Sequence, residues 1–311
     1  KELKEKFSNL DCFTEENEIF GTMIKSSLGN TLRTLKPVII IDEGHKAYSE
    51  QARKTIQNFN PCILLELSAT PPENSNNLVN ITGKELDREE MIKLDIHIIN
   101  KTSLDWKNTL NASWDFRNKL EETAIRYKQN TNVNIRPINL IQVERTGKEQ
   151  RDGKMIHAED AKEYLIKKCG VPEDEIAIKS SEKDDIEGID LLSDDAKIRY
   201  IITKQALQEG WDCSFAYILT ILTNPSSQLS ITQLVGRILR QPYAKKTKVK
   251  ELDESYVFCF RQNAVDLVSN IKSGLESEGL GDIAGRVLLD TDSTRDLSIL
   301  TEIESKYRSK F

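Results

Sequence analysis

The sequence has few cysteines and histidines and no long apolar run. Its 311 residues include 5 cysteines and 3 histidines, and no CxxC pair or His/Cys cluster occurs. This spacing indicates neither a zinc site nor a disulfide framework, and we expect free thiols buried in a reducing compartment. No apolar run approaches the roughly 20 residues of a membrane span, and no signal peptide is visible. These absences favour a cytoplasmic protein without a membrane partner.

A strong positive charge is also absent. The formal net charge is -6, and hydrophobic residues make up 38% of the chain. This balance argues against a uniformly basic protein that coats nucleic acid, but a local basic groove would still allow nucleic-acid binding. The length suffices for about two domains.

Short β-branched runs alternate with helical stretches, which is typical of α/β proteins with parallel sheets and crossover helices. One face of the expected helix 103–129 is apolar, and we interpret its tryptophans as core residues rather than as stacking platforms for nucleic-acid bases. Because this helix opens a second lobe, we place a domain boundary near residue 100. The expected strands are 38–42, 62–67, 95–99, 138–143, 175–178, 199–203, 217–222 and 256–260, and the expected helices are 46–58, 103–129, 158–168, 228–240 and 263–277.

Two adjacent carboxylates follow the first β-branched run. The run 37–41 leads into Asp42-Glu43-Gly44-His45. A buried parallel strand would deliver these acids to its carboxyl end, where open α/β sheets place ligand chemistry. In nucleotide-driven motors the first acid holds Mg²⁺ and the second orients the attacking water. Taken alone, the pair is weak evidence, because acids at strand ends are common and more often form a solvated turn.

Small hydroxyl-bearing residues follow the second expected strand. The strand 62–67 ends in Ser68-Ala69-Thr70, and two prolines then stop it. The hydroxyls of Ser68 and Thr70 can bond to neighbouring carboxylates or to a nucleic-acid backbone. The alternative is an ordinary turn.

A third motif follows the expected strand 199–203. Thr203 ends the strand, and the polar stretch after it contains Glu209-Gly210-Trp211-Asp212. Gly210 would allow close approach of the backbone to a ligand, and Asp212 would present a carboxylate at the lobe surface. The alternative is a glycine-containing turn between a strand and a helix.

The fourth motif lies on the expected helix 228–240, which Pro242 ends. Positions i, i+3, i+4 and i+7 of this helix share one face. Two arginines one turn apart, beside a glycine, suit a polyphosphate, because the guanidinium fork stabilises charge on a transferring phosphoryl group. The alternative is a pair of surface arginines. The residues on this face are Gln233, Gly236, Arg237 and Arg240, and those on the packed side are Leu234, Val235 and Ile238.

Together, in this order, the four motifs resemble motifs II, III, V and VI of superfamily 2 helicases and translocases. The surrounding sequence resembles the Res subunit of type III restriction enzymes, as in Asp-Glu-Gly-His-Lys-Ala-Tyr, Glu-Gly-Trp-Asp-Cys and Gln-Leu-Val-Gly-Arg-Ile-Leu-Arg-Gln-Pro. The resemblance implies RecA-like parallel sheets with flanking helices. Residues 1–99 would form part of lobe one, residues 100–285 a complete lobe two, and residues 286–311 the start of a following segment or linker.

The resemblance also implies ATP and Mg²⁺ as cofactors. Asp42 would hold Mg²⁺, Glu43 would orient the attacking water, and His45 would couple the nucleotide site to the second lobe. From that lobe, Gln233 would sense the γ-phosphate. The other implied nucleotide contacts are Gly210, Asp212 and the finger arginines Arg237 and Arg240, and the implied nucleic-acid and coupling residues are Ser68, Thr70 and Thr203.

The sequence departs from the family in two places. The phosphate loop GxxxxGK[ST] is absent, and no nuclease motif is visible after residue 262. We therefore expect a piece of a longer motor that binds ATP poorly and does not hydrolyse it alone. The implied partners are DNA and a modification methyltransferase. Two alternatives stay open: a repair or phage-defence helicase that acts on DNA or RNA without cutting it, and a degenerate lobe that only binds protein or nucleic acid.

Overall fold

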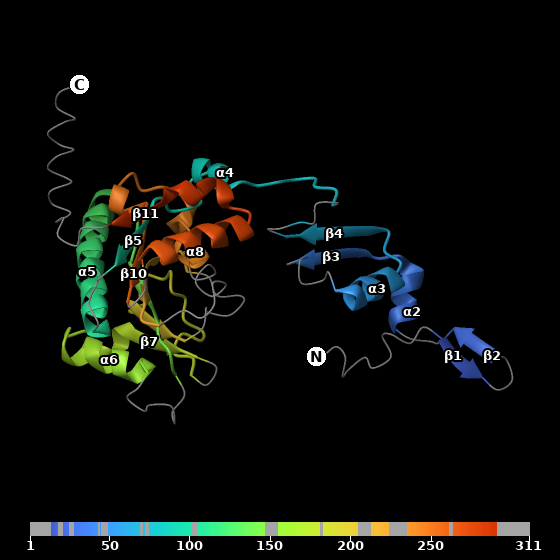
Figure 1. Cartoon of the computed structure of the whole chain (residues 1–311), viewed down its shortest axis with the longest axis horizontal. Helices are drawn as coiled ribbons and strands as arrows, with labels where there is room; N and C mark the ends of the chain where they lie inside the picture. The colour runs from blue at the N-terminus through green and yellow to red at the C-terminus, as the bar shows by residue number, and fades with distance from the viewer. Residues whose placement is uncertain are drawn as a thin grey trace, which may run out of the picture. The chain divides into compact units, whose positions relative to one another are not determined.

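The computed structural model contains two compact units, Lys1–Asn80 and Ile81–Phe311 (Figure 1). Each unit is described by itself. The residues that the structure describes are 14–17, 21–24, 28–42, 44, 49–68, 71, 75–100, 105–146, 155–180, 183–204, 213–223, 235–260 and 264–290.

The first unit contains a parallel pair of strands with helices between and before them. Strand β3 (Val38–Asp42) pairs with β4 (Ile63–Leu67), so that Val38 lies opposite Ile63 and Asp42 opposite Leu67. Helix α3 begins after Ser49, whose hydroxyl accepts a hydrogen bond from the Ala52 amide at 3.3 Å and so caps the helix. The remaining elements are β1 (Thr14–Asn17) antiparallel to β2 (Gly21–Ile24), α2 (Leu28–Leu35) and α3 (Glu50–Asn58).

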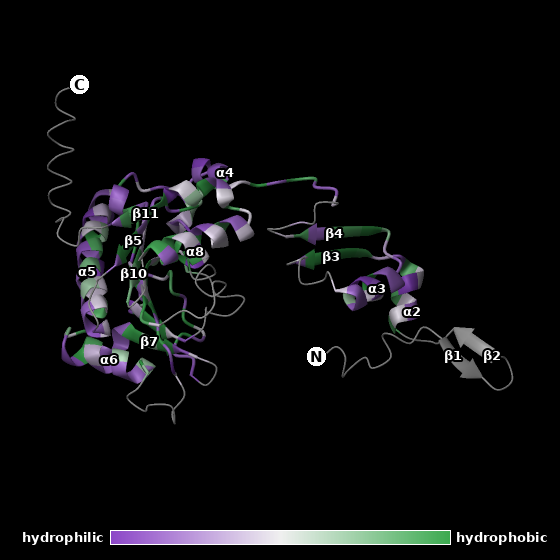
Figure 2. Cartoon of the chain, in the orientation of Figure 1, coloured by the Kyte–Doolittle hydropathy of each residue, from purple (hydrophilic) through white to green (hydrophobic). Residues whose placement is uncertain are grey.

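The β3–β4 pair carries an exposed apolar surface. Figure 2 shows both strands in the hydrophobic colour over most of their length. Parallel sheets normally have both faces covered, and two strands alone are marginal in water. This surface therefore favours further packing partners for the pair. The exposed side chains are Val38, Ile40, Ile63, Leu64, Leu65 and Leu67.

The second unit is built on a seven-stranded sheet in the order β11-β5-β10-β9-β6-β8-β7, in which every pair is parallel. The predicted α/β class with parallel sheets and flanking helices is confirmed. The strands are β5 (Ile96–Asn100), β6 (Ile138–Gln142), β7 (Ile176–Lys179), β8 (Tyr200–Thr203), β9 (Ala216–Ile221), β10 (Ser255–Cys259) and β11 (Val287–Asp290). The helices are α4 (Gly83–Arg88), α5 (Trp106–Thr131), α6 (Ala158–Lys167) and α8 (Ala264–Ser277), with 3-10 turns at Glu173–Glu175, Pro242–Ala244, Lys250–Leu252 and Gly281–Arg286.

Helices cover both faces of this sheet, with α5 on one face and α8 on the other (Figure 1). Phe116 of α5 packs against Tyr256 and Phe258 of β10, with ring centroids 4.4 and 5.6 Å apart. Trp106 and Trp114 pack against the buried cluster around Leu110. The prediction that these tryptophans are core residues is thus confirmed.

A buried lysine holds the start of β9 in place. Lys93, which is fully buried, donates from Nζ to the carbonyl oxygens of Ser214 and Ala216 at 3.0 and 2.7 Å, and lies over the Tyr217 ring. Burial lowers the pKa of Lys93 well below its usual value. Because β9 starts at Ala216, this side chain ties the segment before β5 to the start of β9.

The cysteines only partly follow the prediction of buried free thiols. Cys213 and Cys259 are buried, and burial raises their pKa values to about 11 and about 12. Cys62, in contrast, is exposed, and Cys12 lies outside the described residues. Among the helices in the described ranges, none has the length and apolarity needed to cross a membrane.

The domain boundary lies before the one that the sequence predicted. The two compact units divide between Asn80 and Ile81, not near residue 100. Strand β5 pairs with β10 and β11 and so belongs to the sheet of the second unit. The predicted linker 286–311 also begins with a sheet strand, because β11 pairs with β5. Long-range parallel pairing, which leaves no local sequence signal, explains both differences.

We predict that a chain starting at residue 81 folds without the first unit. It keeps all seven strands, so it should unfold cooperatively by circular dichroism and calorimetry. A chain starting at residue 101 is the matched control. This shorter chain lacks β5, which lies between β11 and β10 and contains the fully buried Ile96 and Ile98. It should therefore show no cooperative unfolding transition. Equal stability of the two chains would contradict the boundary between residues 80 and 81.

A second prediction concerns the close packing of α4 against the turn Gly281–Arg286. The carboxylate of Asp282 accepts the amides of Gly83 and Lys84 at 3.0 and 2.8 Å. A Cβ at Gly83 would lie only 2.8 Å from Ile283 Cγ2 and 2.9 Å from Asp282 Oδ1. Gly83→Ala should therefore lower the free energy of unfolding by about 1–3 kcal/mol in denaturant titrations.

The matched control is Gly285→Ala in this same turn, Gly281–Arg286. A Cβ there meets nothing within 4 Å, so the free energy of unfolding should change by less than about 0.5 kcal/mol. If Gly83→Ala and Gly285→Ala lower the free energy of unfolding equally, the close contact at Gly83 is not the reason why a glycine is needed there.

Candidate functional site

The carboxyl ends of β3 and β4 bring two predicted site residues to one edge. Asp42 is the last residue of β3 and is exposed, and Ser68 directly follows β4 and is half-buried. Since Asp42 lies opposite Leu67 in the register, Asp42 and Ser68 are neighbours at this edge. Glu43, His45 and Thr70 lie outside the described residues.

The backbone after Asp42 passes close to a further acidic residue that the sequence analysis did not single out. A Cβ at Gly44 would lie 3.3 Å from both Cβ and Oε2 of Glu66 on β4. Gly44 is buried, whereas Glu66 is exposed. A second described carboxylate therefore lies near this edge, and Gly44 allows the backbone to pass close to the Glu66 side chain. The sequence signal that could have indicated Glu66 is an acid within the otherwise apolar strand Ile-Leu-Leu-Glu-Leu.

Thr203 lies at the carboxyl edge of the seven-stranded sheet. It ends β8 and is buried, and its carbonyl oxygen accepts the Val143 amide at 2.8 Å. The predicted place of Thr203 at a strand end is confirmed. Gly210 and Asp212, which follow in the sequence, lie outside the described residues.

The arginine motif begins on a helical segment, residues 235–238, whose packed side is as predicted. Val235 and Ile238 are fully buried in the main core. Gly236 and Arg237 are half-buried, and a Cβ at Gly236 would meet nothing within 4 Å. Open space therefore lies beside the glycine, next to Arg237. Leu234 and Gln233 lie outside the described residues.

Arg240 does not share a helix with Arg237, and the prediction of a helix to residue 240 is wrong at this end. The helical segment stops at residue 238, and Arg240 forms an isolated antiparallel bridge with Ile92. The amides of Lys93 and Gln241 donate to Leu239 and Met91 at 2.6 and 2.9 Å. Tertiary hydrogen bonds here replace the helical ones, and Pro242 disfavours helical backbone at the residue before it.

This bridge sets the position of Arg240 relative to the sheet. Its partner Ile92 precedes β5, and the carbonyl of Ile238 accepts the hydroxyl of Ser255, the first residue of β10, at 3.0 Å. Arg240 is exposed near the amino ends of these strands, whereas Thr203 lies at a carboxyl end. The structure therefore does not bring Arg240 and Thr203 together.

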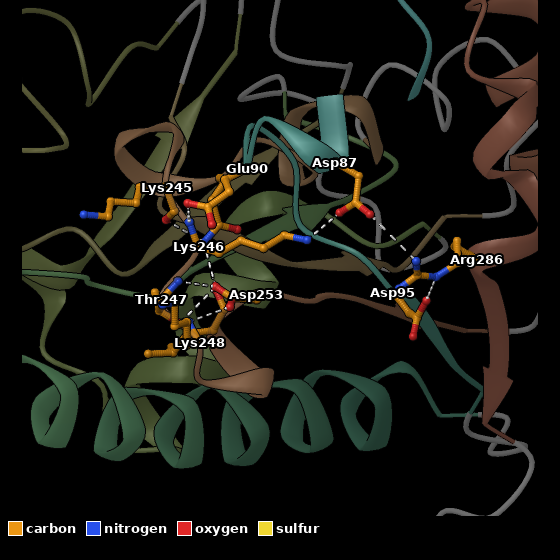
Figure 3. A network of polar contacts seen from close by, with 11 residues as sticks. Asp87, Glu90, Asp95, Lys245, Lys246, Thr247, Lys248, Asp253 and Arg286 are labelled. Carbon is orange, nitrogen blue, oxygen red and sulfur yellow. Dashed lines mark hydrogen bonds and ion pairs between the residues drawn. The ribbon is translucent and has the colours of Figure 1, made fainter. Parts of the chain in front are cut away.

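The segment after Arg240 is fixed by a polar network around Asp253 (Figure 3). One carboxylate oxygen of Asp253 accepts the amide and hydroxyl of Thr247 at 2.7 and 2.9 Å, and the other accepts the Lys248 amide at 2.9 Å. Gln241 Nε2 donates to the same carboxylate at 2.8 Å. The basic loop 245–248 is therefore held in a defined conformation, although Lys248 has a positive φ of 64°.

Ion pairs connect this loop to α4 and to the turn before β11. Lys246 pairs with Asp87 through Nζ, and its amide donates to Glu90 at 3.2 Å. Arg286 reaches both Asp87, at 3.9 Å, and Asp95 (Figure 3). The charge of Lys246 is thus balanced within the protein, and it is not free to contact a phosphate backbone.

A histidine lies among carboxylates at the start of β5. His97 Nε2 is 3.0 Å from Glu254 Oε2, and its Nδ1 is 3.3 Å from Asp290 Oδ2. Burial disfavours the charged imidazole, but the two carboxylates outweigh burial and raise the pKa of His97 to about 9. The two carboxylates therefore favour the protonated imidazole at this position.

The comparisons with known proteins support the sequence resemblance over part of the chain. Residues 4–73 match the family model described as "Type III restriction enzyme, res subunit". No curated protein sequence matches the chain.

Solved structures similar to the chain include three at low sequence identity. The ATP-dependent Type ISP restriction-modification enzyme LlaBIII bound to DNA is 10% identical, with a TM-score of 0.49, covering 88% of this chain and 24% of that one. A putative HsdR subunit of a type I restriction enzyme from Vibrio vulnificus is 14% identical, with a TM-score of 0.47, and the match covers 85% of this chain and 50% of that one. A DEAD box protein from Methanococcus jannaschii is 14% identical, with a TM-score of 0.40 and coverages of 82% and 60%.

The chain thus spans less than two thirds of each of these structures. The family match covers the segment that carries Asp42, Glu43, Ser68 and Thr70, which are the residues of the first two motifs. Residues 4–73 are accordingly similar to the family of the res subunit of type III restriction enzymes.

Proposed function

We propose that this chain is part of an ATP-dependent DNA translocase or helicase motor, that of the Res subunit of a type III restriction endonuclease. The observation that carries the proposal is the position of Asp42. It lies exposed at the carboxyl end of a parallel strand pair, beside Ser68, in a segment that matches the Res family. Ligands in open α/β sheets bind at this edge.

The carboxylates at this edge suit the metal of a nucleotide complex. Asp42 would hold Mg²⁺, which prefers carboxylate oxygens together with substrate phosphates. The ion, when bound, would neutralise charge on the transferring phosphoryl group. Glu43 would orient the attacking water and accept its proton. Ser68, Thr70 and His45 would couple this site to nucleic acid and to the second lobe.

The second unit would supply the cations that complete the site. Arg237 lies beside the open space at Gly236, where a phosphate oxygen could approach. Arg240 is exposed and would act as a second finger, with Gln233, Gly210 and Asp212 as further nucleotide contacts. Thr203 would contact the nucleic-acid backbone. In this proposal the two units are parts of RecA-like lobes, and their closure would join hydrolysis to movement on DNA.

Two features favour a motor that needs more chain than these 311 residues. The sequence contains no phosphate loop, whose backbone amides and lysine would hold the β- and γ-phosphates. The β3–β4 pair has an exposed apolar surface that further strands or helices would cover. In the complete protein we propose DNA as substrate and a modification methyltransferase as partner.

We predict that the 311-residue chain hydrolyses no ATP above background, because the phosphates lack their loop. The measurement is phosphate release with and without double-stranded DNA. The control is the same assay on the complete parent protein, which should show DNA-stimulated turnover. DNA-stimulated hydrolysis by the 311 residues alone would overturn the proposal that an outside segment is required.

A further prediction concerns single substitutions in the complete protein. Glu43→Gln should keep ATP binding but abolish hydrolysis, because the water loses its base. Arg240→Ala should lower kcat by about 10³-fold if the guanidinium stabilises the transferring phosphoryl group. Steady-state ATPase rates and nucleotide-binding titrations would measure both effects.

Arg126→Ala is the matched control for this series. Arg126 is exposed on α5, where it contacts Thr123 of the same helix, so its loss should leave kcat unchanged. Near-normal turnover in Glu43→Gln or in Arg240→Ala would remove that residue from the catalytic site.

A further inference from the structure

Three potential metal ligands converge in the second unit, and none of them has a role in the function proposed above. Asp95 precedes β5, His97 lies on β5, and Glu254 precedes β10. One ligand atom of each lies within 4.8 Å of the others. Asp95 and His97 alternate along an extended chain and so point to the same face. The Ser255 amide donates to the Asp95 carbonyl at 2.9 Å, which places Glu254 beside them.

The imidazole of His97 lies close to the carboxylate of Glu254. Nε2 of His97 is buried and 3.0 Å from Glu254 Oε2, yet it has no hydrogen-bond partner of acceptable direction. When two ligand atoms bind the same metal ion, they lie at a distance similar to this one, and their lone pairs point at the ion rather than at each other. The side chains of His97 and Glu254 are 15% and 8% exposed, so the group is largely enclosed but reachable from solvent.

Neighbouring groups orient these ligands as they do in metal sites. Asp290 Oδ2 lies 3.3 Å from Nδ1 of His97, the ring atom that faces away from Glu254. A carboxylate on the far nitrogen of a ligating histidine fixes the tautomer and the ring direction. Tyr256 stacks on the imidazole at 5.4 Å and donates its hydroxyl to Glu254 Oε2 at 3.3 Å. Both ring position and carboxylate position are therefore set before any ion binds.

The charges also suit a divalent ion. Three carboxylates, those of Asp95, Glu254 and Asp290, surround the imidazole. Arg286 pairs with Asp95 through Oδ1 and leaves the other carboxylate oxygen for a ligand. With a neutral imidazole, the three acids and Arg286 sum to a charge that one divalent cation cancels.

We propose that Asp95, His97 and Glu254 form a binding site for a divalent transition-metal ion, with Zn²⁺ as the ion of choice. One imidazole nitrogen and two carboxylate oxygens are a donor set that Zn²⁺ accepts, whereas Mg²⁺ prefers oxygen ligands alone. Three protein ligands leave a fourth tetrahedral position for water. A bound ion would link the starts of β5 and β10 and, through Asp290, the edge strand β11. This site is independent of the proposed ATPase chemistry.

Zinc binding to the chelator-treated 311-residue chain tests the proposal. The exposed thiol of Cys62 could bind Zn²⁺ by itself, so the measurements use Cys62→Ser as the parent. Calorimetric titration should give one ion per chain, and Zn²⁺ should raise Tm. The chain has only three histidines, and Zn²⁺ should shift the imidazole Cε1–H resonance of one of them. Mg²⁺ at the same concentration should cause neither effect.

Substitutions assign the site. His97→Gln should abolish the stoichiometric Zn²⁺ binding and remove the shifted resonance. Glu254→Gln should also abolish the stoichiometric Zn²⁺ binding. Asp290→Asn, which alters only the orienting carboxylate, should weaken binding by about 10–100-fold. His157→Gln is the matched control, because that buried histidine caps α6 by accepting the Glu159 amide at 3.1 Å and is not part of the group formed by Asp95, His97 and Glu254.

Two results would overturn the proposal. One is a lack of stoichiometric Zn²⁺ uptake by the Cys62→Ser chain. The other is a Zn²⁺ affinity that His97→Gln leaves unchanged. If His97→Gln fails to fold, as judged by circular dichroism without metal, the resonance shift in the parent and the titration of Glu254→Gln decide the question. None of these assays measures ATP hydrolysis. A lack of metal binding would therefore not contradict the proposed motor function.

Discussion

Parallel pairing of strands is the constraint on which the rest of this structure depends. Parallel strands point the same way, so the residues that follow each strand gather along one edge. Asp42 and Ser68 are neighbours for this reason alone, since 25 residues, helix α3 among them, lie between the two in the sequence. The same rule places Thr203 at the carboxyl edge of the seven-stranded sheet. Helices on both faces then keep the strands buried and the edge free for ligands.

The opposite edge of the large sheet is held by tertiary contacts rather than by local structure. Lys93 ties the segment before β5 to the start of β9, and the bridge between Ile92 and Arg240 ties it to the arginine motif. Asp253 fixes the loop that follows (Figure 3). These contacts decide where Arg240 lies, and they also assemble the group around His97. One edge therefore carries both a residue proposed for phosphate chemistry and a proposed metal site.

Much of the fold was predictable because the spacing of apolar residues along the sequence indicates most of its strands and its long helix. Each of the eight expected strands appears within a residue or so of its predicted bounds, and the long helix of residues 103–129 appears as α5. Strand β11 was not predicted, because Val-Leu-Leu-Asp is too short to show a strand pattern by itself. It forms a strand because it pairs with β5. The end of the arginine helix was misplaced because backbone groups at residues 239 and 241 find partners near Ile92. Neither partner is visible in local sequence.

The sequence by itself determined the α/β class, the order of the motifs and the similarity of residues 4–73 to the res-subunit family. These properties follow from residue patterns that are local, or that repeat at the spacing of a strand or a helix. Only the tertiary structure decided that β5 belongs to the second unit, that Arg240 leaves the helix of Arg237, and that Asp95 and His97 meet Glu254. In each case the interaction joins residues far apart in the chain, and its free energy depends on a burial and a geometry that no local pattern encodes.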